Sequence, residues 1–387
     1  MELNCASVKC FEIFEKLNDF VRPVGCNILD TGKNGVPNKL TYFSVLILLA
    51  YCTVTLTSIY QFRENFILFT NALVTLGFSI QGIVKFYTMF VRRHRLLRAV
   101  FKSRDFIVEF EGNKQICELF KKYANFCAMC GTMILGLYSF AMSMLLVATV
   151  TISYWTKTKI IPYGIVIPLI DYKSDVGYAI NMVYMTFSIV YGVIGLYASD
   201  YIYVYVMIMA YGQVETIGIL CQDLSTYLEK NKENEIQEIY QLFTKTVTAQ
   251  QLHTEYMKSL EENFEFNSIT VIITSMICMA ITIFVLIQEV WINGIMIIII
   301  QLWQIFTICL IGGVYMIKIN QVQVQINDTK WYLLSHRMQK MFLNVIHFMQ
   351  NPIEPSACGI RPLNLETFCQ CIKAMYQFLM LLLNMSN

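Results

Sequence analysis

Long stretches without a single charged residue constrain the fold of this 387-residue chain most strongly. A helix needs about 20 apolar residues to cross a hydrocarbon core of roughly 30 Å. Six uncharged stretches are long enough. They lie between Lys39 and Arg63, Glu64 and Lys85, Lys122 and Lys157, Asp175 and Asp200, Glu265 and Glu289, and Glu289 and Lys318. Each stretch therefore predicts one membrane-spanning helix.

A seventh span is predicted at the end of the chain, over residues 363–385. It contains Glu366 and Lys373, so only residues 374–387 are free of charge. The composition supports a bilayer environment, because 56% of the residues are hydrophobic and 14% are charged, against about 25% charged in a soluble domain. We therefore expect an all-α integral membrane protein with seven spans.

The distribution of lysine and arginine predicts how these spans are oriented, because cytoplasmic loops carry an excess of both residues. With the N-terminus inside, 23 of the 29 basic residues fall in cytoplasmic segments and 4 in outer loops. The first 39 residues show no apolar core followed by a cleavage site, so no cleavable signal peptide is expected. The prediction is a cytoplasmic N-terminus and an extracellular C-terminus.

The predicted topology divides the chain into six parts. Apolar residues at helical spacing, such as Val214, Ile217 and Leu220, indicate helices that extend the later spans into the cytosol. These extensions could pack on one another or on neighbouring subunits. The parts are a cytoplasmic N-terminal segment (1–39), spans one to four (40–212), a cytosolic helical extension (213–264), spans five and six (265–317), a cytosolic helix and link (318–362), and span seven (363–385).

Two other classes of membrane protein fit the sequence less well. A G-protein-coupled receptor would place the basic run at Arg92, Arg93, Arg95 and Arg98 outside, against the charge rule. All seven prolines lie outside the spans, and the outer loops contain no cysteine for an extracellular disulfide. A secondary transporter usually has paired helices broken by glycine or proline, and neither such breaks nor an internal repeat are found.

An enzyme or a nucleic-acid-binding protein is not expected either. The four histidines show no metal-binding spacing, and no nucleophile with an accompanying base and acid is apparent. We therefore predict no catalytic residues, no metal and no cofactor. The net charge of +2 gives no sign of a protein that neutralises phosphates, so no nucleic-acid partner is expected.

The end of the chain, residues 351–383, reads NPIEPSACGIRPLNLETFCQCIKAMYQFLMLLL. This segment resembles the insect odorant receptor family, in which a cytosolic helix leads through a short proline-rich link into the final helix. The matching residues are Leu363, Leu365, Glu366, Thr367, Phe368, Lys373, Ala374, Tyr376, Leu381 and Leu382. The outer loop IPYGIVIPLIDYKSDVGYAINMVY and the positions of Asp200, Gln213 and His253 are similar to the family as well.

This resemblance implies a subunit of a tetrameric, odorant-gated, non-selective cation channel. In such channels a tuning subunit pairs with a shared odorant receptor co-receptor, which has an enlarged cytosolic loop that this chain lacks. The expected partners are the co-receptor, a small volatile organic ligand, membrane lipid and permeating cations. The expected location is the plasma membrane of an olfactory sensory neuron, with the cytosolic extensions forming an intersubunit anchor. Gustatory receptors share this architecture and remain the nearest alternative.

The final helix would line the pore if the resemblance holds. Helical spacing puts Gln377, Met380 or Leu381, and Asn384 on one stripe together with Lys373. By resemblance, Leu381 takes the gate position and Asn384 the polar position one turn outward. Ligand binding would then favour a state in which this helix splays and Leu381 leaves the axis. The alternative is that residues 379–383 simply face lipid or other helices.

The family places its ligand pocket between spans two to six, in their outer halves. The candidate ligand-binding residues are Asn71, Val74, Phe78, Phe140, Ser143, Met144, Val147, Met182 and Met185. Ordinary packing between helices is the alternative for each of them. Lys85 and Asp200 are ionisable residues in or near the membrane, which makes them functional candidates, with a structural ion pair as the alternative.

Overall fold

The computed structural model describes residues 5–24, 29, 39–229, 236–288 and 291–386. Within this described part the chain is almost entirely helical. The long elements in chain order are α1 (Ala6–Val21), α2 (Lys39–Gln61), α3 (Phe66–Phe90), α4 (Arg93–Phe110), α5 (Lys114–Thr156), α6 (Asp175–Glu229), α7 (Ile236–Gln288), α8 (Ile292–Asp328), α9 (His336–Gln350) and α10 (Leu365–Ser386). Short 3-10 helices lie at Arg22–Val24 and Trp331–Leu333.

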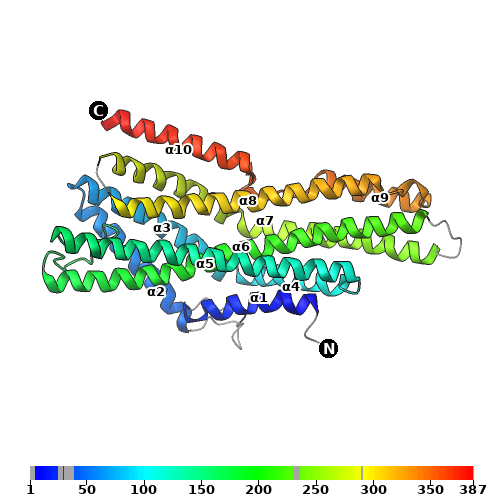
Figure 1. Cartoon of the computed structure of the whole chain (residues 1–387), viewed down its shortest axis with the longest axis horizontal. Helices are drawn as coiled ribbons and strands as arrows, with labels where there is room; N and C mark the ends of the chain where they lie inside the picture. The colour runs from blue at the N-terminus through cyan, green and yellow to red at the C-terminus, as the bar shows by residue number, and fades with distance from the viewer. Residues whose placement is uncertain (1–4, 25–28, 30–38, 230–235, 289–290, 387) are drawn as a thin grey trace.

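The prediction of seven membrane spans is confirmed. Among the described residues, α2, α3, α5, α6, α7, α8 and α10 are long and apolar enough to cross a membrane. The helices α6, α7 and α8 are much longer than a bilayer requires and continue unbroken past their apolar stretches. These continuations and α9 form one end of the elongated bundle in Figure 1, whereas α2, α3 and α10 lie toward the other end.

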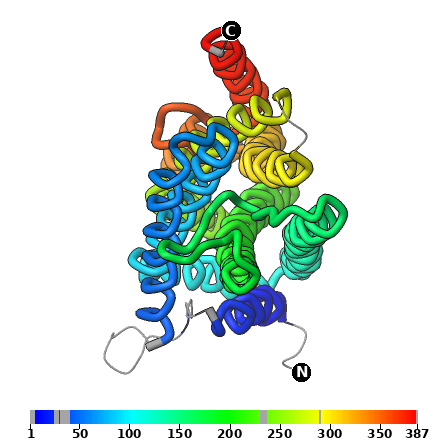
Figure 2. The backbone as a smooth tube through the Cα atoms, turned by 90° about the vertical axis from the view of Figure 1, so that its left-hand side faces the viewer, coloured from blue at the N-terminus to red at the C-terminus, as the bar shows by residue number. Residues whose placement is uncertain are grey.

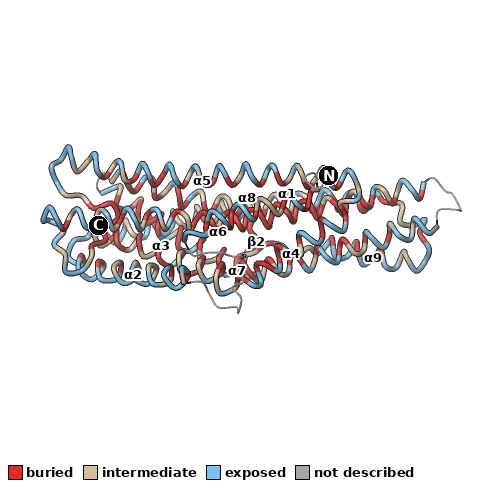
Figure 3. Tube along the Cα trace, turned by 90° about the horizontal axis from the view of Figure 1, so that it is seen from below, coloured by how far each residue is buried: buried red, intermediate tan, exposed pale blue. Residues whose placement is uncertain are grey.

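The centre of the bundle is the middle of α6. Every residue from Leu196 to Val214 is buried except Asp200, and Figure 3 shows buried positions concentrated along the long axis. A helix that is hydrophobic on all sides is stable only where other helices surround it. The aromatic and aliphatic sequence of this segment therefore determines its central position.

The helices α2 and α10 lie at the periphery. Only 17% of the apolar window of α2 and 11% of that of α10 are buried within the chain. Figure 2 shows α10 projecting at one edge of the bundle, beyond α8. Large side chains on α2, including Leu46, Leu49 and Leu56, are exposed. Such surfaces need lipid or a partner subunit to cover them.

Two helices outside the seven spans, α1 and α4, were not part of the sequence-based expectation for residues 1–39 and 86–122. In α1, the buried residues Ala6, Cys10, Phe14 and Leu17 recur at helical spacing, a pattern that was present in the sequence. Burial raises the pKa of the Cys10 thiol to about 12, so this thiol stays protonated at neutral pH. Cys10 therefore adds no charge to the apolar interface between α1 and the rest of the bundle.

A small hairpin connects α9 to α10. Strands β1 (Ser356–Ala357) and β2 (Arg361–Pro362) pair antiparallel, and the turn between them contains Cys358 and Gly359 with positive φ. The backbone N–H of Ser356 donates to the Glu261 carboxylate of α7, 3.0 Å away. This contact ties the proline-rich link to the bundle just before α10 begins. The charged link at 230–235, between α6 and α7, lies outside the described residues.

Candidate functional site

A cavity of about 150 Å³ lies among α2, α3, α6 and the loop that follows α5. Aromatic residues, methionines, leucines and isoleucines make up most of its wall. Representative lining residues are Leu48, Tyr51, Phe78, Met142, Met185 and Ile189. A concave, mainly apolar space with a few polar groups is typical of a site for a small organic ligand.

Glycines on α6 make room for this cavity. Gly192 and Gly195 both line it, and a Cβ built at either position meets no atom within 4 Å. Gly82 of α3 also lines it, and a Cβ there would lie 3.5 Å from Leu48 of α2. The small residues of α6 thus leave a gap that α2 and α3 do not fill.

The loop between α5 and α6 covers one end of the cavity. Tyr163 and Ile165 of this loop are buried and line the cavity wall. Thr75 of α3 donates a hydrogen bond to the Tyr163 carbonyl at 3.0 Å. Ser58 of α2 accepts one from the Val166 backbone at 2.8 Å. These contacts hold the loop inside the bundle, so it forms part of the site.

Two of the nine residues predicted to bind ligand, Phe78 and Met185, line this cavity. Asn71 and Val74 are buried nearby. Asn71 lies under the loop, where a Cβ on Gly164 would come within 2.8 Å of the Asn71 Cβ. The thiol of Cys278 on α7 donates a hydrogen bond to the Val74 carbonyl oxygen, with 3.7 Å between sulfur and oxygen. Both residues therefore serve packing against other elements.

The remaining five predicted residues lie away from the cavity. Met182 contributes to a separate, open hollow near the ends of α5 and α6. The other four lie on an exposed face of α5; they are Phe140, Ser143, Met144 and Val147. The α5 residue that does reach the cavity is Met142. The sequence analysis selected α5, which does contribute to the cavity. The rotation of α5 about its own axis, however, determines which of its side chains points toward the cavity.

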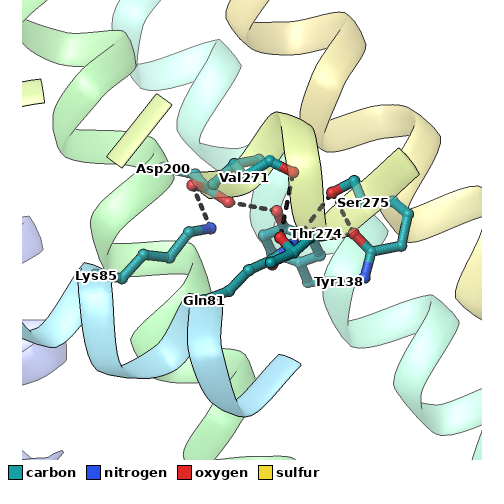
Figure 4. Close-up of polar contacts among 8 residues, drawn as sticks. Gln81, Lys85, Tyr138, Asp200, Val271, Thr274 and Ser275 are labelled. Carbon is teal, nitrogen blue, oxygen red and sulfur yellow. Dashed lines mark hydrogen bonds and ion pairs between the residues drawn. The ribbon is translucent and has the colours of Figure 1, made fainter. Parts of the chain in front are cut away.

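A buried ion pair adjoins the cavity. The Lys85 ammonium of α3 lies 2.6 Å from Oδ1 of Asp200 on α6, and the Tyr138 hydroxyl of α5 donates to Oδ2 at 2.5 Å. Figure 4 shows the three side chains converging from three helices. Lys85 also lines the cavity. A charge in a low-dielectric interior is tolerated only when it is paired and hydrogen-bonded, and both conditions are met.

A second polar cluster lies one turn along α3. The Gln81 amide donates to Thr274 at 2.8 Å, to Ser275 at 3.1 Å and to Gln301 at 3.2 Å. Thr274 and Ser275, labelled in Figure 4, belong to α7. Gln301 belongs to α8. The wall helix α3 is thereby hydrogen-bonded to α7 and α8, the two helices against which α10 packs.

The predicted pore residues share one face of α10. Gln377, Met380, Leu381 and Asn384 are all exposed. The opposite face carries the buried Leu379, which packs with Ala280 and Phe284 of α7. The stripe that helical spacing predicted is therefore the face of α10 turned away from its own bundle.

Sequence reasoning missed several cavity residues, above all those of α2 and of the loop after α5. Tyr51, Tyr163 and Met142 line the cavity, yet none was a candidate. The glycine pair at Gly192 and Gly195 was a usable signal, since two glycines three residues apart leave a gap on one face of a helix. The inward fold of the loop had no signal of that kind.

Comparison with known proteins establishes the family. A family model described as the seven-transmembrane odorant receptor matches residues 65–376. The chain belongs to the odorant receptor family. This odorant receptor is 18% identical over 362 residues to a protein of Drosophila melanogaster described as putative odorant receptor 83c, and the match covers 90% of each chain.

Solved structures show the same fold. The insect olfactory receptor OR5 from Machilis hrabei matches with a TM-score of 0.82 at 12% identity, over 97% of this chain and 99% of that one. The same receptor in complex with eugenol gives a TM-score of 0.81 at 12% identity, over 98% and 99%. Odorant receptors are receptors rather than enzymes, and the seven spans make this one a multi-pass membrane protein.

Proposed function

We propose that this odorant receptor is the ligand-binding, tuning subunit of a ligand-gated, non-selective cation channel. The observation that carries the proposal is the apolar cavity among α2, α3 and α6, with a volume of about 150 Å³. An apolar protein cavity of about this volume can hold a molecule as small as benzene. The ligand that fits is a small, volatile, mainly apolar organic molecule.

The proposed assembly is a heterotetramer with the odorant receptor co-receptor in the plasma membrane of an olfactory sensory neuron. The asymmetry of lysine and arginine supports a cytoplasmic N-terminus and an extracellular C-terminus. The exposed face of α10 supports an assembly in which partner subunits surround that face. The continuations of α6, α7 and α8, together with α9, would then form the intersubunit anchor in the cytosol.

The proposed gate is the exposed stripe of α10. Four copies of Leu381 around an axis would form a hydrophobic constriction, with Asn384 providing a polar ring for the cation. Ligand binding opens the pore only if the open state binds the ligand more tightly than the closed state does. Contacts that connect the cavity to α10 run through Gln81 and Gln301 to α8. On α8, the ring of Phe306 packs against the ring of Phe368 of α10, with a distance of 5.5 Å between the ring centroids.

The test is whole-cell voltage clamp of cells that express this chain with and without a co-receptor. We expect at least one compound of a volatile panel to evoke a current only when both subunits are present. Replacing external sodium by potassium should preserve that current, because the pore does not discriminate between them. The proposal is wrong if both subunits reach the surface and no volatile evokes a current, or if the response depends on a G protein.

A further inference from the structure

Most hydroxyl groups in the cavity wall are already committed to acceptors within the protein. Ser79 donates to the Thr75 carbonyl at 3.0 Å, and Ser188 donates to the Tyr184 carbonyl at 2.9 Å. The Tyr163 hydroxyl donates to the Met142 sulfur at 3.2 Å. A ligand in the cavity would therefore have to compete with the protein for each of these three protons.

Lys85 is different because its ammonium group has three N–H donors. One of them goes to Asp200, and within the described residues the other two have no acceptor. The Lys85 side chain is only 3% exposed, so water reaches it poorly. Tyr51, also in the wall, has a hydroxyl for which the described residues offer no hydrogen-bond partner, but that group is neutral. The strongest available donor of the cavity is thus the Lys85 ammonium.

The charge of the pair limits which acceptor fits. Lys85 and Asp200 together are neutral, so a carboxylate ligand would add an uncompensated negative charge to an apolar space. A hydrocarbon would leave the two N–H groups of Lys85 desolvated and unpaired. A neutral oxygen avoids both penalties, because it accepts a hydrogen bond from an ammonium without adding charge.

We propose that Lys85 selects the ligand class of this receptor: a small neutral molecule with a carbonyl oxygen, such as a ketone, ester or aldehyde, whose oxygen accepts a hydrogen bond from Lys85 while the apolar remainder fills the cavity. This inference rests on the proposed function. It goes beyond that function by assigning a specificity-determining residue and a chemical class of ligand.

The experiment compares straight-chain ketones with the alkanes and carboxylic acids of equal chain length, by concentration-response currents of the chain expressed with a co-receptor. For the wild type, the half-maximal concentration of the ketone should be about tenfold or more below that of the alkane, as expected for a hydrogen bond to a charged group. The acid should be less potent than the ketone.

Substitutions then assign this preference to Lys85. Since Lys85→Met alone leaves Asp200 buried without its cation, the main variant is Lys85→Met combined with Asp200→Asn. It should raise the half-maximal concentration of the ketone about tenfold or more and should not raise that of the alkane, which no longer leaves N–H groups of Lys85 unpaired. The matched control is Lys173→Met, the same substitution at an exposed position in the loop before α6, which should change neither value.

Each outcome decides between the two proposals. If no volatile evokes a current in the wild type, the proposed function fails. If volatiles evoke currents but the wild type does not prefer the ketone over the alkane, only the role of Lys85 is overturned, and this comparison requires no variant to fold. An equal change for ketone and alkane in the double variant also overturns it.

Discussion

Lys85 and Asp200 form an ion pair, 2.6 Å between the ammonium and Oδ1, with the Lys85 side chain only 3% exposed. Removing one partner of a buried ion pair typically costs about 3–5 kcal/mol, because the remaining charge is left uncompensated. Replacing both partners by neutral groups costs much less. The sequence identified both residues as intramembrane candidates, but only the structure shows that they meet, since they are separated by 115 positions in the chain.

This difference gives a prediction for stability. Asp200→Asn and Lys85→Met should each lower the thermal stability of the detergent-solubilised receptor strongly. The double variant should be more stable than either single variant, because no unpaired charge remains. Thermal unfolding of the three proteins measures this directly. Losses in the double variant that equal the sum of the single losses would show that the two groups do not interact.

The pore residues of α10 give a second prediction at this scale. Leu381→Ala and Asn384→Ala should change the relative permeability to cations or the closed-state leak, because both side chains face the proposed conduit. Current under ion substitution, recorded from cells that also express the co-receptor, is the measurement. Leu382→Ala, on the face that packs toward α7, is the control. Unchanged permeation in both test variants would remove them from the pore.

At the scale of elements, charge-free stretches predicted the membrane helices well because their length and composition follow from the bilayer alone. The cavity could not be predicted in the same way. Its position depends on the rotation of α5, which points Met142 inward in place of Ser143, and on a loop that folds into the bundle. These features arise from packing between segments distant in sequence, and periodicity within one helix carries no information about them.

The packing of α8 against the start of α10 can be tested with neighbouring glycines. A Cβ on Gly312 would approach the Leu363 carbonyl oxygen to 2.1 Å, whereas one on Gly313 would keep 3.8 Å from its nearest neighbour. Gly312→Ala must therefore displace the backbone that leads into α10. We expect it to reduce evoked current per surface receptor strongly, while Gly313→Ala has little effect. Equal effects of the two variants would contradict the role of this contact.

At the scale of the whole molecule, the proposed orientation, with the N-terminus in the cytoplasm, would separate this receptor from G-protein-coupled receptors, which have an external N-terminus. An epitope tag fused before residue 1 should be labelled by antibody only after cells are permeabilised. A tag fused after residue 387 should be labelled on intact cells. Labelling of the N-terminal tag on intact cells would contradict both the orientation and the channel that depends on it.

If the cavity among α2, α3 and α6 receives the ligand that opens the channel, a bulky side chain that fills the cavity must weaken the response to that ligand. Gly192→Phe would place a ring where a Cβ meets open space in the cavity. Gly136→Phe makes the same change at a position of α5 with equal room that does not line it.

The measurement is the volatile-evoked current of each variant, expressed with the co-receptor and normalised to its surface level. We predict that Gly192→Phe raises the half-maximal concentration of the activating volatile about tenfold or more, since the ring occupies space in the cavity that the ligand would fill. Gly136→Phe should match the wild type. A Gly192→Phe receptor that responds like the wild type would show that the ligand binds elsewhere.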